Sequence, residues 1–253
     1  MAASSILWIS ALIDSLLHAI SGAGLNPRLA LKGLHLYKVR GVGVVAVRGG
    51  TDDFYHAIPG REGDVDAFVR SCLKEGTVFV DVGANIGYYT LIASRLVGPQ
   101  GRVHSIEPVP STAAILETNV RLNSRPNVSV HKVAAWSSRG ALILRIPGSW
   151  YGLASASRNG RGVPVDSITL DELLESEDSI DCMKIDVEGA ELEVLRGARD
   201  VLKRTKCLVI EISHSASEVL KILQGAKFKC RKARFTTYVL CERPETSSSR
   251  EGQ

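Results

Sequence analysis

The stretch FVDVGANIGYYT, residues 79–90, passes from an apolar strand pattern to an amphipathic helix pattern through a loop with two glycines. Glycine at such a corner lets the backbone pass close beneath a ligand, and the following helix offers free N–H groups. The loop lacks the G-x-G-x-x-G spacing that seats a dinucleotide pyrophosphate, and no G-K-[ST] follows it. Asp81 would repel phosphate but can accept hydrogen bonds from an ammonium group. The stretch therefore predicts a strand–loop–helix unit for a ligand that carries an amino group.

Apolar strand patterns alternate with amphipathic helix patterns along most of the chain. Strands are expected at residues 78–80, 103–106, 128–133, 141–146, 183–186, 207–212 and 236–241. Helices are expected at residues 64–74, 88–96, 111–123, 169–174, 190–202 and 217–223. Thr169, with Glu172 three residues later, is expected to cap the fourth helix. This alternation predicts an α/β fold, in which helices cover both faces of a mostly parallel sheet.

The patterns divide the chain into three parts. Residues 1–60 are expected to form a small helix and hairpin extension, with short strands in 34–47 and a further strand at 54–58. Residues 61–244 would form the α/β domain. Residues 245–253 are rich in Ser, Glu and Arg, which predicts a flexible tail.

Residues 6–20 are apolar at three- and four-residue spacing, which predicts an amphipathic helix. Its apolar run is too short and too polar to span a membrane. The helix would either dock on its own domain or contact a membrane surface or a partner.

The composition is that of a globular protein. Of 253 residues, 45% are hydrophobic and 23% charged, which excludes collagen-like and disordered chains. The net charge of +4 comes from scattered basic residues, so it does not by itself indicate nucleic-acid binding. The five cysteines are widely spaced, which predicts neither a zinc site nor a disulfide framework and is typical of the cytoplasm. No pattern indicates an oligomeric state.

A second motif, Ile106-Glu107-Pro108, ends the next expected strand. An acid at this position can accept hydrogen bonds from ribose hydroxyls, as in NAD enzymes, or can simply be solvated. Together with a loop unsuited to pyrophosphate, Glu107 favours a nucleoside that bears an amino acid, S-adenosylmethionine.

The chain between residues 64 and 244 resembles the FkbM family of methyltransferases. The motifs D81-V-G-A-N-I-G-Y-Y-T, I106-E-P, T169-L-D-E-L, K184-I-D-V-E-G-A-E-L-E-V-L-R-G-A and V209-I-E-I carry the resemblance. It implies a Rossmann-like class I methyltransferase fold, a seven-stranded sheet whose last strand is antiparallel. It also implies S-adenosylmethionine as cofactor, with methyl transfer to a hydroxyl of a small molecule or glycan. The implied cofactor-binding residues are Asp81, Gly83, Ala84, Asn85, Gly87, Glu107, Pro108, Ala134, Ala135 and Trp136.

The motif K184-I-D-V-E-G ends a further expected strand, and alternation would put Lys184, Asp186 and Glu188 on one side of an extended chain. A methyl acceptor hydroxyl needs positioning and removal of its proton, and a carboxylate or a histidine can do the latter. Glu211 and His214 end the next strand on the same rim. These five residues are the catalytic candidates. Lys184 can equally be a buried ion-pair partner, and His214 a structural or solvated side chain.

Other interpretations remain open. Two carboxylates and a histidine can hold a divalent cation, but the chain shows no complete oxygen cage, so no metal is expected. The loop around Trp150 and Tyr151 would form a lid or cover apolar surface. The rival functions are an RNA methyltransferase, an NAD-dependent oxidoreductase and a cofactor-binding scaffold without catalysis.

Overall fold

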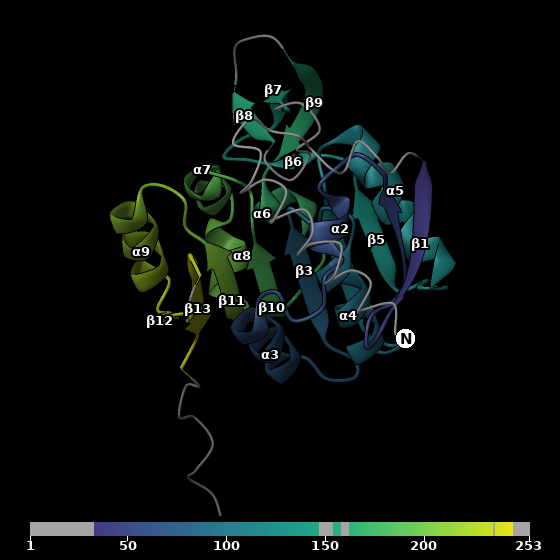
Figure 1. Ribbon diagram of the computed structural model, residues 1–253. Coiled ribbons are helices and arrows are strands. Elements are labelled where there is room, and N and C mark those ends of the chain that lie inside the picture. The colour runs from purple at the N-terminus through teal and green to yellow at the C-terminus, as the bar shows by residue number, and fades with distance from the viewer. Residues whose placement is uncertain (1–32, 147–153, 158–161, 235, 245–253) are drawn as a thin grey trace, which may run out of the picture.

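The computed structural model describes residues 33–146, 154–157, 162–234 and 236–244. Seven strands form the central sheet, in the order β12-β13-β11-β10-β3-β4-β5 (Figure 1). Their bounds are Val78–Val82 (β3), Arg102–Ile106 (β4), Val128–His131 (β5), Ile180–Ile185 (β10), Thr205–Glu211 (β11), Lys229–Lys232 (β12) and Tyr238–Glu242 (β13). Every neighbouring pair is parallel except those of β13, which is antiparallel to β11 and β12. The predicted sheet, with its last strand antiparallel, is confirmed. Strand β12 has no counterpart among the strands predicted from the sequence.

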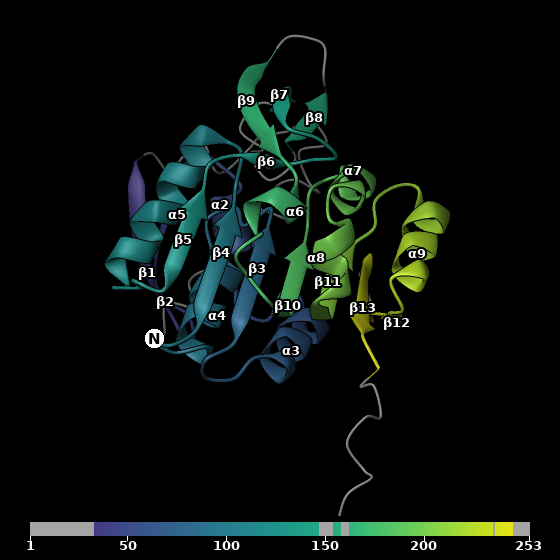
Figure 2. The same ribbon diagram turned by 180° about the vertical axis from the view of Figure 1, so that it is seen from behind.

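Helices cover both faces of the sheet (Figures 1 and 2). Their bounds are Gly63–Cys72 (α3), Tyr88–Leu96 (α4), Pro110–Leu122 (α5), Leu170–Leu173 (α6), Glu191–Arg196 (α7), Arg199–Lys203 (α8) and Ala216–Gly225 (α9). Because side chains alternate along β3, Phe79 packs on α3 and α4, whereas Val80 faces the cluster that contains α6 to α9. The Thr169 side chain accepts a hydrogen bond from Glu172 N, which confirms the predicted cap of α6.

The N-terminal part of the described chain is a hairpin of β1 (Leu34–Val39) and β2 (Gly43–Arg48). A short helix, α2 (Asp53–His56), follows, so the strand expected at 54–58 is wrong. The buried Asp53 carboxylate accepts hydrogen bonds from Arg48 N, Nε and Nη2. These bonds bring Asp53 back to Arg48, so the chain turns here, whereas an extended strand would separate the two residues. The helix predicted at residues 6–20 lies outside the described residues.

A second sheet of four strands stands above the carboxyl edge of the main sheet, at the top of Figure 1. It contains β6 (Ala134–Ala135), β7 (Gly140–Arg145), β8 (Ser155–Ser157) and β9 (Val163–Ile168), in the order β6-β9-β7-β8. Part of the long loop expected after residue 146 is therefore strand β8. Trp150 and Tyr151 lie outside the described residues.

Two further expectations are wrong. The single helix expected at 190–202 is two helices, α7 and α8, because the chain leaves helical geometry at Gly197 and Ala198. Cys230 and Cys241 form a disulfide, which the expectation of no disulfide framework did not foresee. They are directly paired across β12 and β13, and sequence spacing alone does not reveal that register.

Within the described ranges, no helix combines the length and the apolar character that crossing a membrane would require.

Candidate active site

A cavity opens at the carboxyl ends of β3, β4 and β10, where parallel strands deliver their loops to one edge of the sheet. Most of the predicted site residues line it. They are Gly83, Ala84, Asn85, Glu107, Pro108, Ala134, Ala135, Trp136, Lys184, Asp186 and Glu188. Asp81, Gly87, Glu211 and His214 are not among the lining residues. The structure thus brings the glycine loop that follows Asp81 and the K184-I-D-V-E-G motif to one cavity.

The glycine loop is fixed against the neighbouring strand ends. Gly83 N and Ala84 N donate hydrogen bonds of 2.9 and 3.0 Å to Ile106 O. Gly83 has φ +76°, and a Cβ added there would lie 1.8 Å from Asp186 O. Only glycine allows this approach between the loop and the K184-I-D-V-E-G motif. A Cβ on Gly87 would instead meet Leu116 Cδ1 at 2.5 Å, so Gly87 serves the packing of α5.

Glu107 is buried at the cavity wall and holds the loop through both carboxylate oxygens. Oε2 accepts a 2.9 Å hydrogen bond from Asn85 N, and Oε1 accepts one of 2.9 Å from Val109 N. Burial raises the pKa of Glu107 to about 7. Each carboxylate oxygen can accept a second bond, so Glu107 retains capacity for two ligand hydroxyls.

Asp81 lies buried on β3, beside Lys184 in the strand register. Its Oδ2 accepts a 2.7 Å hydrogen bond from the Thr90 hydroxyl, and its Oδ1 has no partner among the described residues. Burial raises the pKa of Asp81, an effect that the Lys184 ammonium opposes. The predicted contact of Asp81 with a ligand ammonium stays a prediction.

Asp186 is held by two donors on the same oxygen. Lys184 Nζ lies 2.8 Å from Asp186 Oδ2, and the Tyr238 hydroxyl donates to that atom at 2.7 Å. Burial would raise the pKa of Asp186, but the Lys184 ammonium and these hydrogen bonds hold it below its ordinary value. Lys184 is only 3% exposed and yet lines the cavity, so it is an ion-pair partner placed within the site.

Glu188 reaches the cavity by a route other than the predicted extended chain. Strand β10 ends at Ile185, and Glu188 and Gly189 have φ of +50° and +98°. This left-handed turn still places the Glu188 carboxylate beside Asp186. Burial, and then the charge of Asp186, raise the pKa of Glu188 to about 7.

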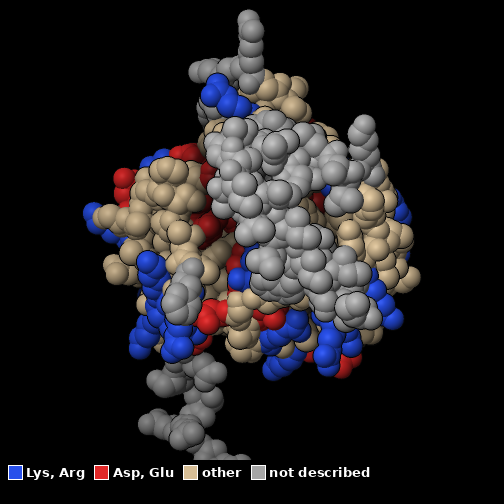
Figure 3. Space-filling model, in the orientation of Figure 1, with Lys and Arg blue, Asp and Glu red and all other residues tan. Residues whose placement is uncertain are grey.

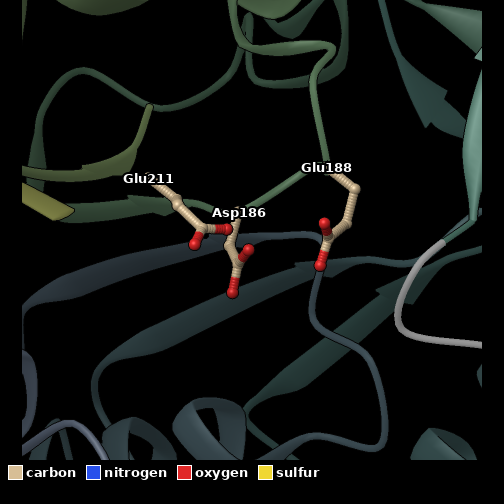
Figure 4. Close-up of side chains that lie close together, drawn as sticks. All are labelled: Asp186, Glu188 and Glu211. Atoms are coloured by element: carbon tan, nitrogen blue, oxygen red, sulfur yellow. The ribbon is translucent and has the colours of Figure 1, made fainter. Parts of the chain in front are cut away.

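Oxygen atoms of Asp186, Glu188 and Glu211 all lie within 4.8 Å of one another (Figure 4). Burial and the bond with Asp186 raise the pKa of Glu211 to about 8, and the Thr237 hydroxyl donates to its Oε1 at 2.6 Å. The spacing is compatible with one cation, although Lys184 and Tyr238 already bind Asp186 Oδ2. The expectation of no metal stays a prediction.

His214 is exposed and is not one of the three acids that lie within 4.8 Å of one another. It follows β11, and its Nδ1 would lie 3.3 Å from a Cβ added to Gly189. His214 thus lies against the turn that carries Glu188, and its predicted catalytic role stays a prediction.

Four side chains at the cavity wall or directly behind it were not predicted from the sequence. Tyr89 donates a 2.9 Å hydrogen bond to Glu62 Oε2, and Arg61 pairs with Glu62 Oε1 at 2.5 Å. Tyr238 donates to Asp186, as described above. Tyr89 lies in residues 79–90, the stretch quoted first. No sequence signal connects Arg61 and Glu62, which precede α3, with Asp186, and none connects Tyr238, which lies 52 residues further along the chain.

Comparison with known proteins is consistent with this geometry. Residues 81–230 match the FkbM methyltransferase domain. The hexuronic acid methyltransferase AglP of Haloferax volcanii is 30% identical over 170 residues, which cover 66% of this chain and 69% of that protein. The 31-O-demethyl-FK506 methyltransferase FkbM of Streptomyces tacrolimicus is 26% identical over 193 residues, covering 62% and 74%.

A crystal structure of methyltransferase FkbM from Methylobacillus flagellatus matches 66% of this chain at 21% identity with a TM-score of 0.48. The match spans 44% of the length of that structure. The family match covers more than half of the present chain and includes both motifs that meet at the cavity. The chain belongs to the FkbM methyltransferase family and is a methyltransferase with the class I fold.

Proposed function

We propose that the protein transfers a methyl group from S-adenosylmethionine to a hydroxyl oxygen of a small molecule or glycan. The observation that carries the proposal is one cavity lined by the glycine loop, Glu107 and Trp136 and also by Lys184, Asp186 and Glu188. The names of the two relatives, which concern a hexuronic acid and 31-O-demethyl-FK506, support a hydroxyl-bearing acceptor.

The cavity wall suits a nucleoside with an attached amino acid. Glu107 would accept the ribose hydroxyls with the lone pairs that Asn85 N and Val109 N leave free. Ala134, Ala135 and Trp136 provide a small, largely apolar wall for a base. When bound, S-adenosylmethionine supplies a methyl group that its positively charged sulfur already activates.

Glu188 is the proposed proton acceptor for the hydroxyl. It lines the cavity, has a pKa of about 7 through burial and the neighbouring Asp186, and so exchanges a proton near neutral pH. Asp186 stays ionised beside Lys184 and positions the acceptor. His214 is outside the cavity lining and is not assigned a role.

Calorimetry with S-adenosylhomocysteine tests the cofactor part of the proposal. Wild type is expected to bind, and Glu107→Gln to bind at least tenfold more weakly because one ribose acceptor is lost. Circular dichroism would check that the variant is folded. Tight binding of NAD in place of S-adenosylhomocysteine would refute the assignment.

A labelled-methyl assay tests the acceptor and the base. Label is expected in metabolite or glycan fractions, and label confined to RNA would contradict the proposed acceptor. Glu188→Gln should lower kcat about 100-fold or more with unchanged S-adenosylhomocysteine affinity. Glu218→Gln is the matched control, because Glu218 lies on α9 with a 59% exposed side chain. Equal turnover in wild type and Glu188→Gln would remove Glu188 from the mechanism.

A further inference from the structure

A second hollow adjoins the cavity and shares Arg61 and Glu62 with it. Its other wall comes from the end of β11 and from the β12–β13 turn, through Glu211, Lys232 and Tyr238. Tyr238 also donates to Asp186 in the first cavity. An acceptor whose hydroxyl reaches Asp186 and Glu188 can therefore extend into this second hollow.

The charges of the hollow do not cancel. Glu62 is engaged by Arg61 and by the Tyr89 hydroxyl. Glu211 accepts from the Thr237 hydroxyl and has a pKa raised to about 8 by burial and by its bond with Asp186, so it is largely protonated near neutral pH. Lys232 is exposed and forms no ion pair with any residue that the structure describes. One positive charge remains on this wall.

The surroundings add to this field. Edge strand β12 also exposes Lys229 and Arg231, and Figure 3 shows Lys and Arg gathered at this edge of the molecule. Neighbouring like charges at an open hollow favour anions over neutral solutes, and salt screens the effect within about 10 Å at 0.1 M.

We propose that the second hollow binds an anionic group of the methyl acceptor, a carboxylate or a phosphate monoester, through Arg61 and Lys232. This inference rests on the proposed function, because it places the acceptor's hydroxyl at Asp186 and Glu188. Arg61 offers a planar set of donors to such a group and Lys232 a mobile point charge. The Thr236 and Thr237 hydroxyls complete the polar wall.

The test is calorimetry on the full chain saturated with S-adenosylhomocysteine. Three probes are compared: methyl β-D-glucuronide, glucose 6-phosphate and the neutral methyl β-D-glucoside. At least one anionic probe is expected to bind about tenfold more tightly than the glucoside, and to weaken as salt is raised. The two anionic arms distinguish a carboxylate from a phosphate acceptor. Equal binding of all three probes, or no binding of either anion at concentrations up to about 20 mM, would overturn the proposal.

Variants locate the binding. Lys232→Gln should reduce anion affinity about tenfold with unchanged affinity for S-adenosylhomocysteine, and Arg61→Gln should act in the same direction. Lys229→Gln, on the same exposed strand but outside the hollow, is the control and should change little. Equal losses in the Lys229 and Lys232 variants would show a diffuse surface field and refute the site. Anion binding is also titrated without S-adenosylhomocysteine, so that it can be judged separately. If S-adenosylhomocysteine binds neither wild type nor any variant, that result refutes the proposed function instead.

Discussion

Asp186 shows how a single residue can set the properties of its neighbours. Lys184 and Tyr238 both bind its Oδ2, which keeps the carboxylate ionised although its side chain is only 20% exposed. Its negative charge then contributes to the raised pKa of Glu188 and of Glu211. Three neighbouring acids are thereby separated into one ionised group and two that titrate near neutral pH.

Tyr238→Phe tests this arrangement, because it removes one donor and keeps the ring. With less compensation of the Asp186 charge, the pKa of Glu188 should rise, and the acid limb of the pH–rate profile should move to higher pH. Loss of one charge-assisted hydrogen bond should lower kcat roughly 3- to 10-fold. Tyr37→Phe, in β1, is the control. A lower kcat with an unmoved acid limb would indicate that Tyr238 acts only through packing.

At the scale of the elements, the break between α7 and α8 matters most for the site. Gly197 lies against Trp136 at the cavity wall, so close that an added Cβ would be 2.0 Å from Trp136 O. The chain leaves helical geometry there and at Ala198, with φ of −91° and −125°. The periodicity of residues 190–202 predicts one continuous helix, but a continuous helix would not make this close approach to Trp136.

Gly197→Ala should therefore destabilise the protein by about 2–3 kcal/mol and weaken S-adenosylhomocysteine binding, because the clash is with backbone at Trp136. Urea unfolding and calorimetry would measure the two effects. Gly225→Ala is the matched control: it ends α9 with open space around its Cβ position, and alanine there should be neutral or stabilising by up to about 1 kcal/mol. Similar stability of both variants would contradict the close contact.

At the scale of the whole molecule, one buried side chain joins the hairpin to the glycine loop. Asn119, on α5, accepts from Ala46 N at 2.6 Å and donates to Ala46 O and Ile86 O at 3.2 and 2.8 Å. Val45 and Val47 pack in one cluster with Ile86, Leu91 and Ile92. The division into a 1–60 extension and a 61–244 domain stays a prediction, and residues 33–60 pack on the domain as part of its core.

The acids of the site should also make global stability depend on pH. Glu107 and Glu188 have pKa values of about 7 in the folded protein, against an ordinary value of 4.5, mainly because burial disfavours their charged forms. The folded state therefore binds more protons than the unfolded state between these values, so the free energy of unfolding should fall as pH rises from about 4.5 to 7. Asp186, whose pKa is lowered, acts oppositely and only at acidic pH.

Glu188→Gln should flatten this decline and be more stable than wild type at pH 8, by roughly 1 kcal/mol after allowance for its partial exposure. Urea unfolding at pH 5 and pH 8 would measure it. A parallel decline in wild type and variant would show that Glu188 keeps its ordinary pKa.

The sequence by itself determined the elements and motifs whose cause is local. The period of apolar residues predicted the strands and helices that build the sheet, with α4 predicted at its observed bounds. The glycines of residues 83–87 and the acid Glu107 predicted which strand-end loops line the cavity. This was possible because the conformational freedom of glycine and the position of a residue at the end of a strand are both properties of a short stretch of sequence. The failures are also informative: Asp53 bonding to Arg48 turned a predicted strand into α2.

Only the tertiary structure decided which distant side chains meet. It placed Tyr238 on Asp186, Arg61 at the junction of the two hollows, and Cys230 opposite Cys241, and it left His214 outside the cluster. These contacts depend on the order of strands in the sheet, where β13 inserts between β12 and β11, and β11 in turn lies beside β10. Periodicity encodes which face of an element is buried, whereas strand order follows from the combined packing of all elements, so no single stretch of sequence contains it.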